Sequence, residues 1–129
     1  MAEGMLWLTI DWHGADADLP EELQERFTVA QLQELRELEE VTQVQRVADP
    51  EVPEGGMGAA WLLGLLQAEV NFANLQKVVR IVRDRIPGKP INFTVEANGR
   101  KFSVENVRPE ELDATLDKLL AAAKKLAED

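Results

Sequence analysis

The most apolar long stretch of the chain, from Met57 to Ile86, constrains the fold more than any other segment. Hydrophobic residues recur through it at alternating steps of four and three, at Trp61, Leu65, Ala68, Phe72, Leu75, Val79, Val82 and Ile86. This spacing keeps them on one face of an α-helix and predicts one helix over 57–86. Asn71 and Asn74 mark the point where a break is expected if the helix has one, because asparagine favours caps and turns over helix interiors.

The first half of this stretch is apolar on nearly every side. From Met57 to Gln76 the only charged residue is Glu69. A helix that is apolar all round needs cover on two sides, and a partner chain can supply the second. The candidate partner-binding residues are therefore the hydrophobic side chains of this half: Trp61, Leu62, Leu63, Leu66, Val70 and Phe72. The alternative is that all of them belong to the core.

Two strands are predicted before the long helix. Leu6–Asp11 alternates as a strand and carries apolar residues on both faces, which is typical of a strand inside a sheet. Val41–Val47 is the second, with a less regular alternation. A polar loop over 13–26 follows the first strand, with a turn of helix expected after Pro20.

A helix between the two strands is predicted to start at Thr28. Thr28 and Gln31 match a capping box, and Phe27 and Leu32 stand at the two positions of a hydrophobic staple. Leucines at helical spacing continue the pattern, and the helix is expected to end near Glu40.

The segment after the long helix predicts a β-hairpin, because Asn98-Gly99 is the preferred two-residue turn between alternating strands. The turn fixes the register, and it opposes Val95 to Phe102, Phe93 to Val104, Glu96 to Lys101 and Thr94 to Ser103. A last helix with an inward leucine stripe is predicted from Pro109.

The predicted order is β-α-β-α-β-β-α, in the α/β (α+β) class. A first βαβ unit with a right-handed crossover, joined to the hairpin, predicts a mixed four-stranded sheet packed by helices. The 129 residues suit one domain with one core. Prolines and glycines predict a flexible linker over 48–58, and residues 1–4 and 127–129 are expected to be loose.

Composition excludes several classes of function. The formal net charge of −10 repels nucleic acid and anionic lipid. The chain has no cysteine, so disulfide frameworks and thiol catalysis are excluded. The opening MAEGMLWLTIDWHG lacks a basic region ahead of an apolar stretch, and the most apolar window carries polar residues near its middle. We therefore expect no secretory signal, no membrane span and a cytoplasmic protein.

Candidate binding motifs are weak. Asp11, His13, Asp16 and Asp18 share one loop, but their spacing matches no metal-binding loop, so no metal is expected. Gly55–Gly58 would lead into a helix N-terminus, where free N–H groups can hold an anion. The lysine and hydroxyl residue of a phosphate loop do not follow, and the favoured interpretation is a plain entry into a helix without a cofactor.

The sequence contains few residues suited to nucleophilic or acid–base catalysis. The only serine, Ser103, falls on the wet face of the hairpin, and the only histidine, His13, is distant in sequence. The paired acids fall at helix starts or on exposed faces, where they have no partner that would tune them for catalysis. We expect no catalytic residues and predict that the chain is not an enzyme.

Several segments together resemble a known family. The first strand LTID, the helix motif LQELREL, the linker VPEGGMGAAWLLGLL, the helix end VVRIVRDRI, the hairpin INFTVEANGRKFSV and a closing leucine-rich helix resemble the effector-associated constant component family. This resemblance implies a small bacterial adaptor of conflict systems, acting beside effectors such as caspase-like or trypsin-like peptidases or TIR domains. It transfers no functional residues. The loop over 13–26 and the segment EVNFANL depart from the family's usual pattern.

Three functional hypotheses follow. The first is a non-enzymatic adaptor that binds other proteins, either an effector or copies of itself as a homo-oligomer. The alternative is a regulatory domain that binds a small molecule or an anion at Gly55–Gly58. The third, an enzyme that uses the Asp11–Asp18 loop with a metal, would require tight, stoichiometric metal binding.

Overall fold

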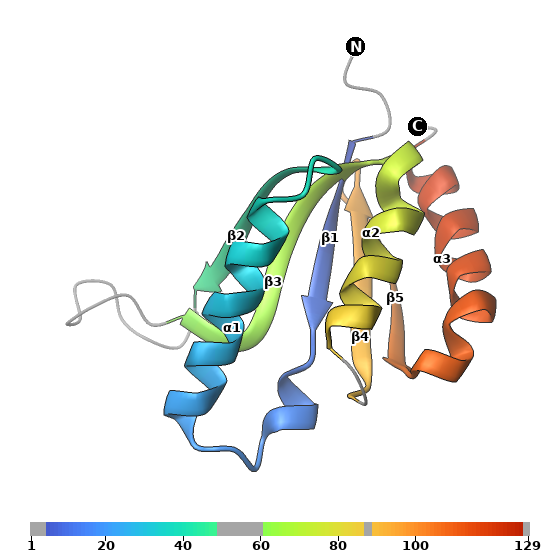
Figure 1. Cartoon of the computed structure of the whole chain (residues 1–129). Coiled ribbons are helices and arrows are strands. Elements are labelled where there is room, and N and C mark those ends of the chain that lie inside the picture. The colour runs from blue at the N-terminus through green and yellow to red at the C-terminus, as the bar shows by residue number, and fades with distance from the viewer. Residues whose placement is uncertain (1–4, 49–60, 87–88, 128–129) are drawn as a thin grey trace.

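The computed structural model describes residues 5–48, 61–86 and 89–127, which form one five-stranded antiparallel sheet and three α-helices (Figure 1). In chain order the elements are β1 (Met5–Asp11), a 3₁₀ turn η1 (His13–Asp16), α1 (Glu21–Arg36), β2 (Val41–Ala48), β3 (Trp61–Asn71), α2 (Phe72–Arg85), β4 (Ile91–Ala97), β5 (Arg100–Val107), a 3₁₀ turn η2 (Pro109–Glu111) and α3 (Leu112–Ala127).

The sheet order is β2-β3-β1-β4-β5. The two strands joined by α1, β1 and β2, are therefore not neighbours in the sheet, and neither are β3 and β4, which α2 joins. β3 lies antiparallel between β1 and β2, and β1 lies antiparallel between β3 and β4. From β1 to β4 this is the βαββαβ arrangement known as ferredoxin-like, or split βαβ. The predicted class is confirmed. The predicted mixed four-stranded sheet is wrong, because the sheet has five strands and all of its pairs are antiparallel. The strand that was not predicted is β3, and it separates β1 from β2.

The helices lie on one face of the sheet (Figure 1), and the core lies between the two layers. β1 shows the division: Leu6, Leu8 and Ile10 face the helices and are buried, while Trp7 and Thr9 alternate to the opposite, half-exposed face. Full burial of such aliphatic side chains stabilises the fold by roughly 2 kcal/mol each. We call the surface of the sheet that no helix covers the open sheet face.

The prediction of one helix over 57–86 is wrong, because Trp61–Asn71 forms strand β3. The deciding pattern is the alternation of Leu66, Ala68 and Val70, all fully buried, with half-exposed polar residues between them. Trp61, Leu65 and Ala68 also fit helical spacing, and short apolar runs are ambiguous between the two periods. Pairing on both sides, with β1 and β2, settles the conformation as a strand.

The possible break at Asn71–Asn74 coincides with the place where strand β3 ends and helix α2 begins. Asn71 is the N-cap of α2, and its side-chain Oδ1 accepts a hydrogen bond of 2.9 Å from the backbone N–H of Asn74. At the other end of α2, the buried Arg83 donates hydrogen bonds to the carbonyl oxygens of Val107, at 2.6 Å, and Ile86. Burial lowers the pKa of Arg83. This guanidinium therefore ties the end of α2 to the end of β5.

The prediction that the first helix starts at Thr28 is wrong. α1 begins at Glu21, after Pro20, and ends at Arg36 rather than near Glu40. Thr28 is fully buried in mid-helix, where its hydroxyl donates to the carbonyl of Gln24 (2.8 Å) and accepts from the N–H of Gly64 (2.9 Å). The threonine that resembles a cap therefore joins α1 to β3.

The predicted polar loop over 13–26 is wrong in part, because 13–16 form the turn η1 and α1 already begins at Glu21. The other local predictions are confirmed. β1 and β2 cover the predicted strands, and β1 lies inside the sheet. The hairpin pairs as the Asn98-Gly99 turn requires, with Val95 opposite Phe102, Phe93 opposite Val104, Glu96 opposite Lys101 and Thr94 opposite Ser103. The last helical segment begins at Pro109, as a 3₁₀ turn that continues into α3.

Some predictions concern residues outside the described ranges. The expected linker over 48–58 overlaps the structure only at Ala48, the last residue of β2. Of the ends expected to be loose, 1–4 and 128–129 lie outside the described residues, and Ala127 is the last residue of α3.

The close approach of β3 to η1 requires glycine at position 64. Gly64 has φ +70°, and a Cβ there would lie 2.9 Å from the Cα of His13. Gly64→Ala should therefore destabilise the fold by more than the ~1 kcal/mol cost of a left-handed alanine. Gly99 has φ +75° but no atom within 4 Å of an added Cβ, so Gly99→Ala should lower the unfolding free energy by that backbone cost alone. Gly14→Ala, which also meets no neighbour, should lower it less than either of the other two substitutions. Urea unfolding measures the unfolding free energy of all three variants. Equal losses of unfolding free energy at positions 64 and 99 would contradict the close contact between Gly64 and His13.

The hydroxyl of Thr28 should matter more than its shape. Thr28→Val keeps the side-chain volume but leaves the buried N–H of Gly64 without its acceptor, which we expect to cost about 1–2 kcal/mol of unfolding free energy. Thr42→Val on β2, where the side chain is exposed, is the matched control and should change stability little. Equal effects of the two substitutions in thermal or urea unfolding would rule out the bridging role of Thr28.

Candidate functional site

The candidate partner-binding residues do not form one patch, because five of them lie on strand β3 and Phe72 lies in the first turn of α2. Leu66 and Val70 are fully buried against the helices, and the half-buried Phe72 packs on the core from the first turn of α2. Leu62 and Leu63 are half-buried, and Trp61 is 42% exposed. Partner binding by these residues stays a prediction, and only the start of β3 offers it an accessible surface.

Trp61 is held on a rigid support. Ala48 at the end of β2 pairs with Trp61, and the guanidinium carbon of Arg46 lies 5.9 Å from the centroid of the Trp61 ring. Arg46 in turn donates two hydrogen bonds to the carboxylate of Glu25 on α1, of 2.6 and 2.7 Å. A bidentate pair of this kind fixes the plane of the guanidinium. We call Glu25, Arg46 and Trp61 the tryptophan mount.

The electrostatics of the mount follow from this geometry. The hydrogen bonds from Arg46, with its charge, hold the pKa of the Glu25 carboxyl below its ordinary value, while burial acts in the opposite direction. The side chain of Arg46 is only 9% exposed, whereas that of Glu25 is 45% exposed. The guanidinium is therefore a largely buried charge whose partner stands at the surface.

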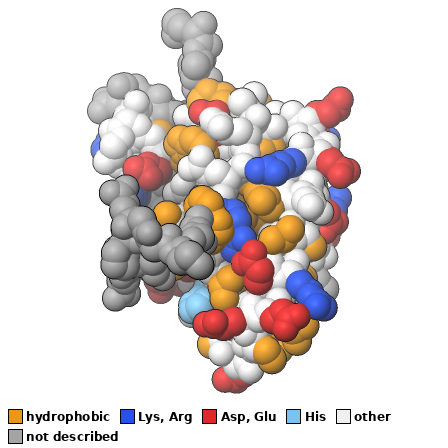
Figure 2. Space-filling view, turned by 90° about the vertical axis from the view of Figure 1, so that its left-hand side faces the viewer, with side chains coloured by type: hydrophobic (Ala, Val, Ile, Leu, Met, Phe, Trp, Pro, Cys, Tyr) orange, Lys and Arg blue, Asp and Glu red, His pale blue; other side chains and the backbone are white. Residues whose placement is uncertain are grey.

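Other large hydrophobic side chains are exposed near the start of α1. Leu19 is 39% exposed and Leu23 is 46% exposed. Figure 2 shows the side of the molecule on which α1 and β2 lie, where hydrophobic side chains stand in separate groups between charged ones. Trp61, Leu19 and Leu23 are the large hydrophobic side chains that are exposed among the described residues.

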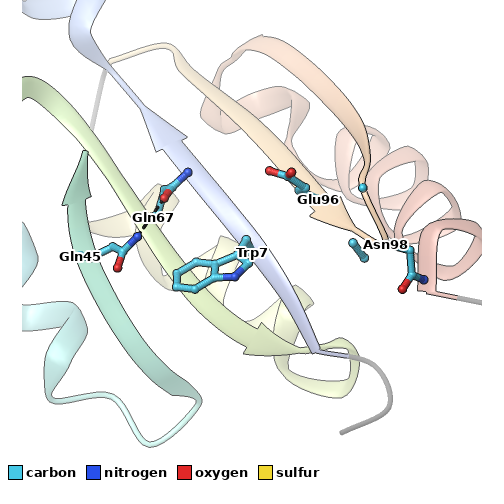
Figure 3. A pocket seen from close by; sticks show the side chains of 7 residues that line it. Trp7, Gln45, Gln67, Glu96 and Asn98 are labelled. Atoms are coloured by element: carbon cyan, nitrogen blue, oxygen red, sulfur yellow. Dashed lines mark hydrogen bonds between the residues drawn. The ribbon is translucent and has the colours of Figure 1, made fainter. Parts of the chain in front are cut away.

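A pocket on the open sheet face offers a second candidate site. It has a volume of about 380 Å³ and is lined by Trp7 of β1, Gln45 of β2, Gln67 of β3 and the segment from Glu96 to Gly99 at the β4–β5 turn. Figure 3 shows the ring of Trp7 between the two glutamines on one side and Glu96 and Asn98 on the other. We call this the Trp7 pocket.

Side-chain hydrogen bonds order the surface around the Trp7 pocket. The amide nitrogen of Gln45 donates to Oε1 of Gln67 (3.2 Å), and the amide nitrogen of Gln67 donates to the hydroxyl of Thr9 (3.4 Å). Thr94 and Ser103 continue the row, with their hydroxyl oxygens 2.7 Å apart. A polar ladder therefore crosses the open sheet face beside an aromatic ring.

The sequence carries only partial signals for these sites. Trp7 alternates away from Leu6 and Leu8, which predicts its face, but no local pattern brings Gln45 or Glu96 beside it. The Glu25–Arg46 pair joins residues far apart in the sequence, on a helix and a strand. Neither pairing can be derived without the sheet order.

The acidic loop has structural partners. The backbone N–H of His13 donates to Oδ1 of Asp11 (2.9 Å), and the ring Nδ1 of His13 lies 3.2 Å from the carbonyl oxygen of Leu63. Asp16 is buried, and its Oδ1 lies 2.6 Å from Nζ of Lys89. Within residues 5–48, 61–86 and 89–127 no group of three or more histidine, aspartate or glutamate side chains is placed to hold a metal ion.

Gly55–Gly58 lie outside the described residues. The helix that they were expected to enter begins at Phe72, and strand β3 intervenes. The N-terminus of α2 is already capped by the Asn71 side chain. The anion-binding hypothesis therefore loses the helix end on which it was based.

The shifted pKa values have structural causes. The hydrogen bond from Lys77, 2.6 Å from Glu40, lowers the pKa of the Glu40 carboxyl and raises that of Lys77. Glu25 and Arg83 owe their shifts to an ion pair and to burial, as described above. Ser103 stands on the wet face of the hairpin with Thr94, as predicted. Glu25, Glu40, Arg83 and Ser103 each form a contact that joins two segments of the fold.

None of the helices in the part of the chain that the structure describes is both long enough and apolar enough to cross a membrane. In comparisons with known proteins, no protein-family model, no curated protein and no solved structure matches the chain.

Proposed function

We propose that the chain is a non-enzymatic cytoplasmic adaptor that acts by protein–protein contact, with Trp61 as the anchor of its partner-binding surface. The observation that supports this proposal is the tryptophan mount. An indole that is 42% exposed rests on a guanidinium that a bidentate carboxylate holds in place. Tryptophan and arginine are the residues most often found to dominate binding energy at protein interfaces.

The rigidity of the mount favours binding. Ordering a flexible side chain at an interface costs roughly 0.5–1.5 kcal/mol, and a ring that is already held in place avoids much of this cost. The two half-buried leucines that follow, Leu62 and Leu63, extend the apolar contact along the start of β3. The six residues predicted from the sequence thus reduce to a smaller surface centred on Trp61.

The partner is another protein, either an effector or a second copy of the chain. The resemblance to the effector-associated constant component family favours an effector of a bacterial conflict system. A homo-oligomer formed through the same surface is the other form of the proposal. An experiment on Trp61 can separate the two.

Site-specific photo-crosslinking tests the proposal. A photoreactive phenylalanine analogue at position 61, expressed in the cells that make the chain, should yield a discrete crosslinked product on irradiation. A product of twice the 14.4 kDa chain mass identifies a second copy, and any other mass identifies a different protein. The same analogue at Asp117, which is exposed on α3, is the control and should yield no such product. Absence of a product at 61, or identical products at both positions, contradicts the proposal.

The tryptophan mount should weaken in acid. Since the pKa of Glu25 is lower in the folded than in the unfolded chain, its pair with Arg46 stabilises the fold above the unfolded pKa. This contribution is lost as the pH falls through the folded pKa. Glu25→Gln should lower the unfolding free energy near pH 7 by no more than about 1 kcal/mol, because the carboxylate is 45% exposed and solvent screens it.

Urea unfolding of wild type and Glu25→Gln at about pH 7 and about pH 3 measures this contribution, and the difference in unfolding free energy between the two proteins should be smaller at the lower pH. Glu22→Gln, which breaks an exposed pair with Arg26, controls for the loss of a surface carboxylate and should have a smaller effect. A difference for Glu25→Gln that is the same at both pH values would show that the pair does not stabilise the fold.

A further inference from the structure

Several side-chain acceptors that line the Trp7 pocket receive no hydrogen bond from another described residue. The amide nitrogens of Gln45 and Gln67 each donate one hydrogen bond within the polar ladder, and that of Asn98 donates one to the carbonyl of Leu126 (2.7 Å). The side-chain oxygens of Gln45 and Asn98 and the carboxylate of Glu96 accept no hydrogen bond from another described residue. A ligand that donates several hydrogen bonds can therefore pair with these acceptors.

Charge around the pocket selects a cation. The Glu96 carboxylate lines the pocket and forms no ion pair with a described residue, although Lys101 stands opposite it on β5. Glu69 lies opposite Trp7 on the other neighbouring strand, so a carboxylate flanks this tryptophan on each side in the register. The face of an indole ring attracts cations, and the net charge of −10 strengthens the local potential.

Among biological cations the guanidinium fits these features best. It is planar, carries five N–H donors and stacks on aromatic rings, whereas an ammonium is a compact point charge with three donors. The pocket volume of about 380 Å³ lies within the range of small-ligand sites. The open sheet face can therefore receive the end of an arginine side chain beside the ring of Trp7.

Two other occupants fit less well. A nucleobase can stack on a tryptophan of an open sheet, but the phosphates that come with it would meet Glu69, Glu96 and an acidic protein. A second copy packed sheet to sheet would bring the same carboxylates of both copies into one two-fold interface, and juxtaposed like charges are unfavourable. Charge complementarity instead favours a different, basic protein.

We propose that the Trp7 pocket binds an arginine side chain from a basic segment of a partner protein. Trp7 stacks on the guanidinium, and Glu96 with the amide oxygens of Gln45 and Asn98 accepts its hydrogen bonds. The pocket lies on the open sheet face, away from the tryptophan mount at the β2 edge beside α1. This inference therefore stands whether or not Trp61 contacts a partner.

Nuclear magnetic resonance titration of the full chain tests the inference with N-acetyl-arginine amide as the probe. The uncharged citrulline analogue, which keeps the shape of the side chain, is the matched ligand. At constant ionic strength the arginine probe should shift the indole N–H signal of Trp7 to saturation, with a dissociation constant in the millimolar range or above. The citrulline analogue should bind about tenfold more weakly, since it lacks the charge. The signal of the buried Trp12 is the internal reference.

Conservative variants locate the binding. Glu96→Gln keeps the side-chain shape and should weaken arginine binding by about fivefold to tenfold. Glu105→Gln removes an exposed carboxylate of β5 that does not line the pocket, and it should leave binding unchanged. Equal binding of the arginine and citrulline probes, an unchanged affinity in Glu96→Gln, or a shift of Trp61 in place of Trp7 would overturn the proposal. So would a shift of Trp7 by a mononucleotide at concentrations where the arginine probe has no effect.

Discussion

Backbone pairing of β3 on both of its edges is the constraint on which the structure depends. Seven register pairs join it to β1, and a second ladder joins it to β2. A strand in this position must satisfy its N–H and C=O groups through its neighbours, because its inner face is buried beneath the helices. Once β3 lies between β1 and β2, the connections through α1 and α2 must each cross over a strand, and both helices lie on the same face.

The junction at Gly64 transmits this constraint to the helical layer. The N–H of Gly64 donates to the hydroxyl of Thr28 in α1, and its carbonyl accepts from the N–H of Trp12 at 2.8 Å. Trp12 in turn packs edge to face on Phe27, with ring centroids 5.8 Å apart. One glycine thus connects the sheet, the turn after β1 and the first helix. Any side chain at that position would separate these elements.

This architecture leaves two different surfaces for interaction. At the β2 edge, the exposed ring of Trp61 rests on a guanidinium that α1 helps to hold. On the open sheet face, Trp7 stands in a polar surface beside acceptors that receive no hydrogen bond from another described residue. The first surface offers an apolar contact and the second offers recognition of a positive charge. In the proposed adaptor, the first surface would hold a partner by shape and the second would select a basic segment by charge.

Local patterns in the sequence determined the parts of the structure that need only neighbouring residues. The Asn98-Gly99 turn specifies the hairpin register, because a two-residue turn leaves one pairing for every residue that follows it. The alternation of Leu6, Leu8 and Ile10 likewise identifies β1 and its buried face. Asn71 and Asn74 indicated only where a helix over 57–86 could break, and the Asn71 side chain caps the first turn of α2 in the structure.

Tertiary structure alone decided the conformation of 61–71, the start of α1 and both candidate sites. The residues of β3 satisfy a helical and a strand period at once, and only pairing with β1 and β2 selects between them. Thr28 matches a capping box, but its hydroxyl is used by Gly64, which lies 36 residues away. The ion pair of Arg46 with Glu25, and the position of Trp7 opposite Glu96, both join elements that become neighbours only in the folded chain. A sequence pattern reports which side chains share a face, whereas contacts between distant elements depend on which strands become neighbours.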